Sequence, residues 1–305
     1  MKEKIDIAVA SPARLGEGAV WDVADACLWW VDIKAGLIHR FDPQSGSNRS
    51  FELGEPVGCL ARRAAGGLIV AAASGFYLFD PETGQRVALV DPEADLTGNR
   101  FNDGGCDPAG RFWAGTMHDD GTPRQQIGAF WRYDDDRTAS RFFDPLYTSN
   151  GLAYSSDGSV MYISDSNAAV QTIWAYDYDL ASGTPTNWRV FYDCAGIDGR
   201  PDGATVDADG CVWTAELRTG DLVRRTPDGE EERRIGMPVK NITSVMFGGA
   251  DLDEIYVTSM ARIDHPGAEA HAAFVTEDRP QFGAGSVFKV TGLGIRGVPE
   301  PRFGG

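Results

Sequence analysis

The chain has 305 residues, of which 42% are hydrophobic, and its 28 basic and 45 acidic side chains give a net charge of −17. A strongly acidic chain without a basic stretch is a poor partner for nucleic acid, because binding to phosphates depends on clustered Lys and Arg. The sequence contains no run of about 18 apolar residues, so it predicts no membrane-spanning helix.

The N-terminus and the cysteines indicate where the protein works. The opening "MKEKIDIAVASPARLGEG" lacks the apolar stretch and the small-residue cleavage site of a secretory signal. The cysteines are odd in number, widely spaced and without a CxxC pair, which predicts reduced, mostly buried thiols and not a disulfide framework or a zinc site; they are Cys27, Cys59, Cys106, Cys194 and Cys211. We therefore expect a cytoplasmic protein.

Short runs of β-branched and aromatic residues, separated by Gly, Pro, Asp and Asn, follow one another along the chain, and helical periodicity is almost absent. Such runs predict an all-β protein. In chain order the clearest are 27–33, 36–42, 67–80, 111–116, 128–134, 160–166, 172–179, 211–217, 220–226, 254–260 and 285–291.

These runs form a repeating unit that opens with a polar or small residue beside a glycine or serine. The openings recur every 40 to 52 residues, at Glu17-Gly18, Val57-Gly58, Asn102-Asp103, Asn150-Gly151, Asp202-Gly203 and Thr243-Ser244. Six such units with four strands each predict a six-bladed β-propeller that uses residues 1–305 as a single domain. The segment 4–10 is expected to pair with the C-terminal strands and close the ring. A two-sheet sandwich, or several small sandwiches, is the alternative.

In a propeller the first strand of each blade lines the central channel, so polar residues at equivalent positions meet at one mouth. Here they would be Glu17, Asn102 with Asp103, Asn150, Asp202 and Thr243-Ser244. Carboxylates gathered there would repel one another unless a divalent cation bound them. An all-oxygen set suits Ca²⁺, Mg²⁺ or Mn²⁺, and also accepts Zn²⁺ or Fe²⁺.

Each of these residues also has an ordinary structural interpretation. Asn150-Gly151 and Asp202-Gly203 are common turn dipeptides, and Glu17 lies between two glycines before a strand. Asp228, in "TPDG", is predicted to be a hairpin turn because charged residues follow it. Asp202, in "RPDG", is followed by an apolar strand, which fits the start of an inner strand. The pattern alone leaves both interpretations of Asp202 and Glu17 open.

Four segments, 15–22, 99–117, 149–166 and 200–215, closely resemble the senescence-marker-protein/gluconolactonase/luciferin-regenerating-enzyme-like family, the regucalcin-like sugar lactonases. The ending 283–305 is also similar to that family's final blade and tail. The resemblance implies a six-bladed propeller with one catalytic divalent metal ion, which hydrolyses an aldonolactone of the glucono-, xylono-, arabinono- or galactono- type to the aldonic acid.

Matched motif by motif, the resemblance implies that Glu17, Asn150 and Asp202 are metal ligands. Arg100 and Asn102 would contact the substrate. Asp202 would be the general base, with Asp103 as the alternative. A family acid that contacts sugar hydroxyls, commonly a glutamate, corresponds to Asp120, and the shorter side chain puts that contact in question.

Other activities are weaker interpretations. The sequence shows no Ser-His-Asp arrangement and no GxSxG, which argues against a serine hydrolase. A propeller hydrolase of phosphotriesters or other esters, and a non-catalytic calcium-binding regulator, stay as alternatives. The expected partner is a small sugar lactone, and we expect a monomer that binds neither membrane nor nucleic acid. The irregular stretch 261–285 would be a lid or a surface loop, and it contains His265 and His271.

Overall fold

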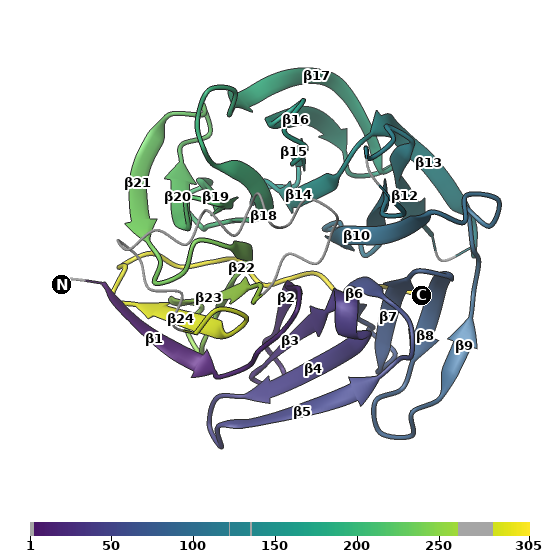
Figure 1. Ribbon diagram of the computed structural model, residues 1–305, viewed down its shortest axis with the longest axis horizontal. Coiled ribbons are helices and arrows are strands. Elements are labelled where there is room, and N and C mark those ends of the chain that lie inside the picture. The colour runs from purple at the N-terminus through teal and green to yellow at the C-terminus, as the bar shows by residue number, and fades with distance from the viewer. Residues whose placement is uncertain (1–2, 122, 135, 262–282) are drawn as a thin grey trace.

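The computed structural model describes residues 3–121, 123–134, 136–261 and 283–305. Six four-stranded antiparallel sheets stand around a common centre, which confirms the predicted six-bladed propeller (Figure 1). That residues 1–305 act as one domain stays a prediction. The described residues also include one 3-10 turn, η1 (Ile33–Ala35). No helix in the described part of the chain is long and apolar enough to cross a membrane.

The first five blades each take four consecutive strands, and the strand nearest the centre comes first. The first blade is β2 (Gly16–Asp22), β3 (Cys27–Asp32), β4 (Leu37–Asp42) and β5 (Ser47–Glu52). The second is β6 (Val57–Arg62), β7 (Leu68–Ala72), β8 (Gly75–Phe79) and β9 (Arg86–Ala88). The third is β10 (Asn99–Cys106), β11 (Phe112–His118), β12 (Gly128–Tyr133) and β13 (Ala139–Leu146). The fourth is β14 (Ser149–Tyr154), β15 (Val160–Asp165), β16 (Thr172–Asp179) and β17 (Thr184–Asp193). The fifth is β18 (Arg200–Val206), β19 (Val212–Leu217), β20 (Asp221–Arg225) and β21 (Glu231–Gly236).

The sixth blade joins the two ends of the chain. Its strands are β22 (Ile242–Gly248), β23 (Glu254–Ser259), β24 (Val287–Thr291) and, on the outside, β1 (Lys4–Val9). β1 pairs antiparallel with β24, with Lys4 opposite Thr291. This pairing closes the ring and confirms the predicted role of the N-terminal segment.

Burial explains why the strands read as continuous apolar runs. A blade is covered on both faces by its neighbours, so its middle strands need apolar residues at every position and not at every second one. All six residues of β3 are buried, as are all five of β7 and all seven of β11. Outer strands such as β5 and β17 are mostly exposed. All five cysteines are free and buried, which confirms the prediction for the thiols.

The C-terminal tail crosses one end of the ring. Gly297 bridges to Asp207 at the end of the inner strand of the fifth blade, and Phe303 bridges to Arg63 in the second blade. Figure 1 shows this yellow segment running across the centre toward β7. The tail therefore covers the end of the channel at which the inner strands finish.

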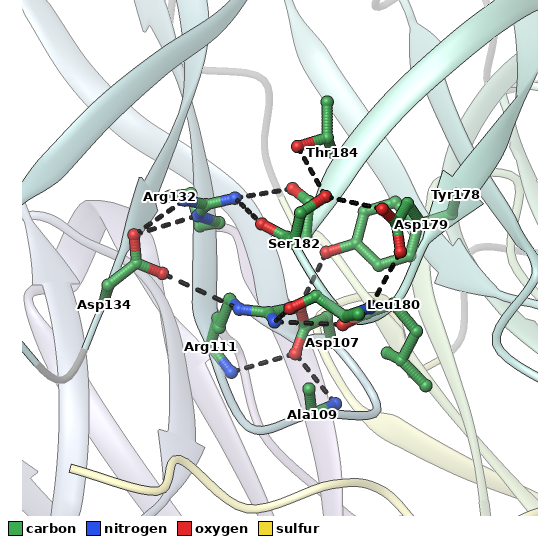
Figure 2. Close-up of polar contacts among 12 residues, drawn as sticks. Asp107, Ala109, Arg111, Arg132, Asp134, Tyr178, Asp179, Leu180, Ser182 and Thr184 are labelled. Atoms are coloured by element: carbon green, nitrogen blue, oxygen red, sulfur yellow. Dashed lines mark hydrogen bonds and ion pairs between the residues drawn. The ribbon is translucent and has the colours of Figure 1, made fainter.

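A buried aspartate holds the third and fourth blades together, as Figure 2 shows. Asp107, which is fully buried, accepts hydrogen bonds from the backbone N–H groups of Ala109 and Arg111, both at 2.9 Å, and closes its own turn. It also accepts from Arg111 Nη1 at 2.7 Å and from the Tyr178 hydroxyl of the next blade at 2.6 Å. Arg111 then donates to the Leu180 carbonyl at 2.9 Å. Removing the Asp107 carboxylate would leave several buried hydrogen-bond donors without an acceptor.

The fifth blade repeats the arrangement, which shows that it belongs to the blade and not to the site. Asp207 is fully buried and accepts from the Cys211 N–H, from Trp213 Nε1 and from Arg224 Nε at 2.9, 2.9 and 2.7 Å.

His39 on β4 is a buried titratable group in the first blade. Its ring stacks on Trp30 at a centroid distance of 3.9 Å, Nδ1 lies 2.8 Å from Ser50 Oγ, and Nε2 is buried without a hydrogen-bond partner. Burial lowers the pKa of His39 from 6.5 to about 4, although the charge of Asp32 acts the other way. Folding therefore favours the neutral ring.

We expect His39 to make the protein less stable in mild acid. Because its pKa is lower in the folded state, its stabilising contribution is complete above pH 6.5 and is lost as pH falls to about 4, a change of about 3 kcal/mol in the free energy of unfolding. Urea unfolding of the parent and of His39→Phe, measured at several pH values in this window, tests the prediction. The control is the difference in the free energy of unfolding between the two proteins at pH 7.5, where His39 is neutral in both the folded and the unfolded state. Equal dependence on pH in both proteins would contradict the assignment.

Candidate active site

Each inner strand changes register with its neighbour at the opening predicted from the sequence. Such a shift is a β-bulge, which leaves extra residues unpaired and re-aims their side chains. The shifts lie at Glu17/Val20, Val57/Cys59, Phe101/Gly104, Asn150/Ala153, Pro201/Ala204 and Ile242/Val245. The bulges leave Asn102 and Asp202 unpaired, and Glu17 and Asn150 are the paired residues directly before a bulge, at the same end of the channel.

Glycines after the site residues permit this backbone. Gly151 has φ of +65°, and a Cβ there would lie 2.7 Å from Ser164 Oγ. At Gly203 a Cβ would lie 2.8 Å from the Ser244 Cα atom of the next inner strand. The glycines of "NG" and "DG" are therefore needed for close approach of neighbouring inner strands, and not for hairpin turns.

Asn102 and Asn150 form a fixed pair of amides across the third and fourth blades. Asn102 Nδ2 donates to Asn150 Oδ1 at 3.0 Å and to the Ser149 carbonyl at 2.8 Å. Asn150 Nδ2 donates to Ser166 Oγ at 2.6 Å, and that hydroxyl donates in turn to the Pro201 carbonyl. These bonds fix which end of the Asn150 amide is the oxygen.

Glu17 and Asp202 are two nearly fully buried carboxyl groups, 5% and 3% exposed. Burial, together with the charge of Asp103, raises the pKa of Glu17 to about 8. Burial and the charges of Glu17 and Asp103 raise the pKa of Asp202 well above its usual range. Glu17 therefore lies close enough to Asp202 for its charge to disfavour the ionisation of Asp202.

The oxygen atoms of this group fit a divalent cation. Asp202 Oδ1 is buried and has no hydrogen-bond partner among the residues that the structure describes. An orphaned buried carboxylate oxygen beside a second carboxylate is costly unless a cation binds both. With the oriented amide of Asn150, the residues present offer the all-oxygen donor set that hard divalent ions prefer.

Arg100 is held beside Asn102 by several contacts. Its Nη1 donates to Asn102 Oδ1 at 2.8 Å and to the Phe101 carbonyl at 2.9 Å, and its Nε donates to Asp119 Oδ2 at 2.7 Å. Lys34 also donates to that Asp119 oxygen. Although burial opposes it, the charges of Arg100 and Lys34 lower the pKa of Asp119 to about 2.

Asp119 was not identified from the sequence as a residue of the site. The family resemblance placed the acid that contacts sugar hydroxyls at Asp120 instead. Arg100 on β10 lies opposite Met117 on β11, so the residues on its face of that strand are Met117 and Asp119. The alternation of side chains between the two faces of a strand could therefore have identified Asp119 from the sequence. Asp120 is exposed, and its contact with the substrate stays a prediction.

Asp103 follows Asn102 within the same bulge, between the paired residues Phe101 and Gly104. Its Oδ2 accepts from the Leu152 N–H at 3.2 Å, and burial raises its pKa to about 6 against the effect of backbone N–H groups. It lines a cavity of about 400 Å³ that follows the inner strands to the C-terminal tail, where Glu300 also lies. The structure thus brings Glu17, Asn150, Asp202, Arg100 and Asn102 to one end and places Asp103 below them.

Two further predictions concern turns and histidines. Asp228 is exposed in the turn between β20 and β21, as its motif predicted. His265 and His271 lie outside the described residues, as does most of the stretch 261–285.

Comparisons with known proteins show the family and the fold of the chain. Residues 15–261 match the model of the SMP-30/Gluconolactonase/LRE-like region. The chain is 39% identical to a Pseudomonas putida protein named 6-deoxy-6-sulfogluconolactonase, with all of both chains covered, and 34% identical to Danio rerio regucalcin, with 99% of each covered. Among solved structures, a luciferin-regenerating enzyme superposes with a TM-score of 0.89 at 25% identity, covering 99% of this chain and 100% of the other. A calcium-binding protein, regucalcin, from Agrobacterium tumefaciens superposes with a TM-score of 0.87 at 30% identity, covering 97% and 96%.

Proposed function

Because the chain belongs to the SMP-30/gluconolactonase/LRE-like family, we propose that it is a metal-dependent lactonase that hydrolyses a sugar lactone to the open aldonic acid. The observation that carries this proposal is the buried group of Glu17, Asn150 and Asp202, with an unpartnered carboxylate oxygen, next to the fixed Arg100–Asn102 pair. The relative from Pseudomonas putida, whose name denotes a 6-deoxy-6-sulfogluconolactone substrate, supports the same class of reaction.

Glu17, Asn150 and Asp202 would hold one divalent cation. A cation in such a site supplies Lewis-acid polarisation of an ester carbonyl and makes water more acidic. Ca²⁺, Zn²⁺, Mg²⁺, Mn²⁺ and Fe²⁺ all accept oxygen ligands. The names of the regucalcin relatives favour Ca²⁺ within this set.

Proton transfer and binding of the sugar would be carried out by side chains of the site. Asp202 Oδ1, which has no other hydrogen bond, would accept a proton from the attacking water and return it to the ring oxygen as the ester bond breaks. Asp103 is the alternative acceptor. Arg100 and Asn102 would contact the sugar, with the guanidinium of Arg100 donating hydrogen bonds to it, and Asp119 would keep that guanidinium in place. Asp120 would contact a sugar hydroxyl from the edge of the site.

A substrate panel tests the proposal. Acid release is measured with pentono- and hexonolactones, homoserine lactone and a phosphotriester. Hydrolysis of the sugar lactones supports the proposal, whereas hydrolysis of only the phosphotriester or other esters would favour the alternative propeller hydrolase. Tight Ca²⁺ binding without acid release from any substrate would instead favour a calcium-binding regulator. We further propose a cytoplasmic monomer, which gel filtration and cell fractionation would test.

Removal of the metal is expected to abolish turnover. Protein treated with EDTA and dialysed should lose lactone hydrolysis by about 100-fold or more, because neither the carbonyl nor the water is then activated. Adding back single divalent ions should restore the rate and identify the preferred metal. Untreated protein carried through the same dialysis is the control. Full activity in thoroughly stripped protein would contradict metal dependence.

A further inference from the structure

Four basic side chains gather at the mouth that carries the candidate site, although the chain as a whole is strongly acidic. Arg100 and Arg200 begin the inner strands β10 and β18, Arg124 lies between β11 and β12, and Lys34 lies in η1 between β3 and β4. In an antiparallel sheet the connection between the second and third strands lies at the end where the first strand begins. We call Lys34, Arg100, Arg124 and Arg200 the basic row.

Among the described residues, the ion pairs of the basic row all go to Asp119, and Asp202 acts on Arg200 only through its charge. Asp119 is shared by three of its members: Lys34, Arg100 and Arg124, whose Nη2 lies 3.7 Å from Asp119 Oδ1. Asp165 also lies near Arg124, but its oxygens already accept three backbone N–H groups. Burial, together with the charges of Arg100 and Arg200, lowers the pKa of Arg124, whose Nη1 donates only to neutral groups.

Arg200 differs from Arg111 and Arg224, which stabilise the blades. Arg111 and Arg224 each donate to a fully buried aspartate. Arg200 Nε, in contrast, is buried and has no hydrogen-bond partner among the described residues. Arg225 of β20 also has buried donors without a partner among the described residues, but it forms an ion pair with Glu216. A buried donor without a partner is rare in native structures and calls for an explanation.

We infer that the basic row binds an oxyanion on the substrate, so that the preferred lactone is an acidic sugar lactone with a sulfonate, phosphate or carboxylate group. This inference rests on the lactonase function proposed above. A guanidinium matches an oxyanion because its N–H groups form a planar fork and keep their charge at neutral pH. Arg200 is two residues from Asp202 on the same strand, and Arg100 donates to Asn102. An anion at the basic row would therefore be joined to a ring at Asp202 by a short substituent.

The test compares one neutral lactone with three acidic ones: glucono-δ-lactone, its 6-phospho and 6-deoxy-6-sulfo derivatives, and glucaro-1,4-lactone, which has a free carboxylate and a five-membered ring. The acidic lactone that fits is expected to exceed glucono-δ-lactone in kcat/KM by about tenfold or more, the value of one charge-assisted hydrogen bond. Arg200→Gln and Arg124→Gln should each lower kcat/KM for that lactone about tenfold more than for the neutral one. The matched control is Arg189→Gln, which removes a half-exposed arginine of β17 and should change neither value.

The outcomes separate this inference from the function on which it rests. If glucono-δ-lactone is hydrolysed as fast as or faster than all three acidic lactones, the inference is wrong and the lactonase stands. If no lactone is hydrolysed, the proposed function is wrong, and calorimetric binding of 6-phosphogluconate against gluconate decides the inference. Tighter binding of 6-phosphogluconate that Arg200→Gln removes would support the basic row, and equal binding of the two acids would overturn it.

Discussion

Asp202→Asn is expected to abolish lactone hydrolysis, by about 10³-fold or more, while the propeller stays folded. The substitution hardly changes volume, and it removes both a cation ligand charge and the proposed proton acceptor. The fold should tolerate it because Asp202 Oδ1 has no donor that would lose its partner. Turnover of glucono-δ-lactone measures the loss of activity, and thermal unfolding of the same preparation measures whether the fold is retained.

The chain contains its own control for this experiment. Asp228 lies in the same Pro-Asp-Gly sequence as Asp202 but is exposed in a turn between two strands. Asp228→Asn should therefore leave turnover at the parental rate. Parental turnover in Asp202→Asn would show that Asp202 is neither ligand nor base.

Metal content distinguishes the two roles proposed for Asp202. If Asp202→Asn binds metal as the parent does but is inactive, its main role is that of the general base. If the metal is lost as well, Asp103→Asn becomes the informative variant. Asp103 lies within the bulge and is held there by backbone N–H groups, so its loss should not remove a ligand.

Asp107→Ala is expected to be the most destabilising single change outside the site, lowering the free energy of unfolding by about 3–5 kcal/mol. The carboxylate is fully buried and satisfies Arg111, the Tyr178 hydroxyl and two backbone N–H groups, all of which would lose a partner (Figure 2). Urea unfolding followed by tryptophan fluorescence measures the loss. Asp107→Asn, which keeps part of the hydrogen bonding, should fall between the alanine variant and the parent.

The matched control is Asp157 in the corresponding turn of the fourth blade. It is exposed, and its bonds reach only Ser155 and Ser159 of its own turn. Asp157→Ala should cost about 1 kcal/mol or less, as is usual for a surface substitution. A similar loss for Asp107→Ala and Asp157→Ala would mean that the contact between blades contributes little.

The sequence predicted the repeat well, because a blade buried on both faces needs an unbroken apolar strand such as β3 or β11. It located the openings at Glu17, Asn150 and Asp202 because their glycines are required where neighbouring inner strands meet. It could not choose between Asp119 and Asp120, since this choice depends on how far β11 continues beside β10. Arg124 carries no local signal, because it reaches the site from a connecting segment whose path only the folded blade defines.

The closure of the ring by β1 and β24 has a consequence for synthesis of the protein on the ribosome. At about 5–20 residues per second, β1 emerges within the first seconds and then waits for β24, which is made almost at the end of the chain. The first five blades consist of consecutive strands and can form as they emerge, but the sixth cannot. Ring closure therefore follows translation, and a chain that stops before Val287 would leave the ribosome with every proposed metal ligand but with β1 unpaired.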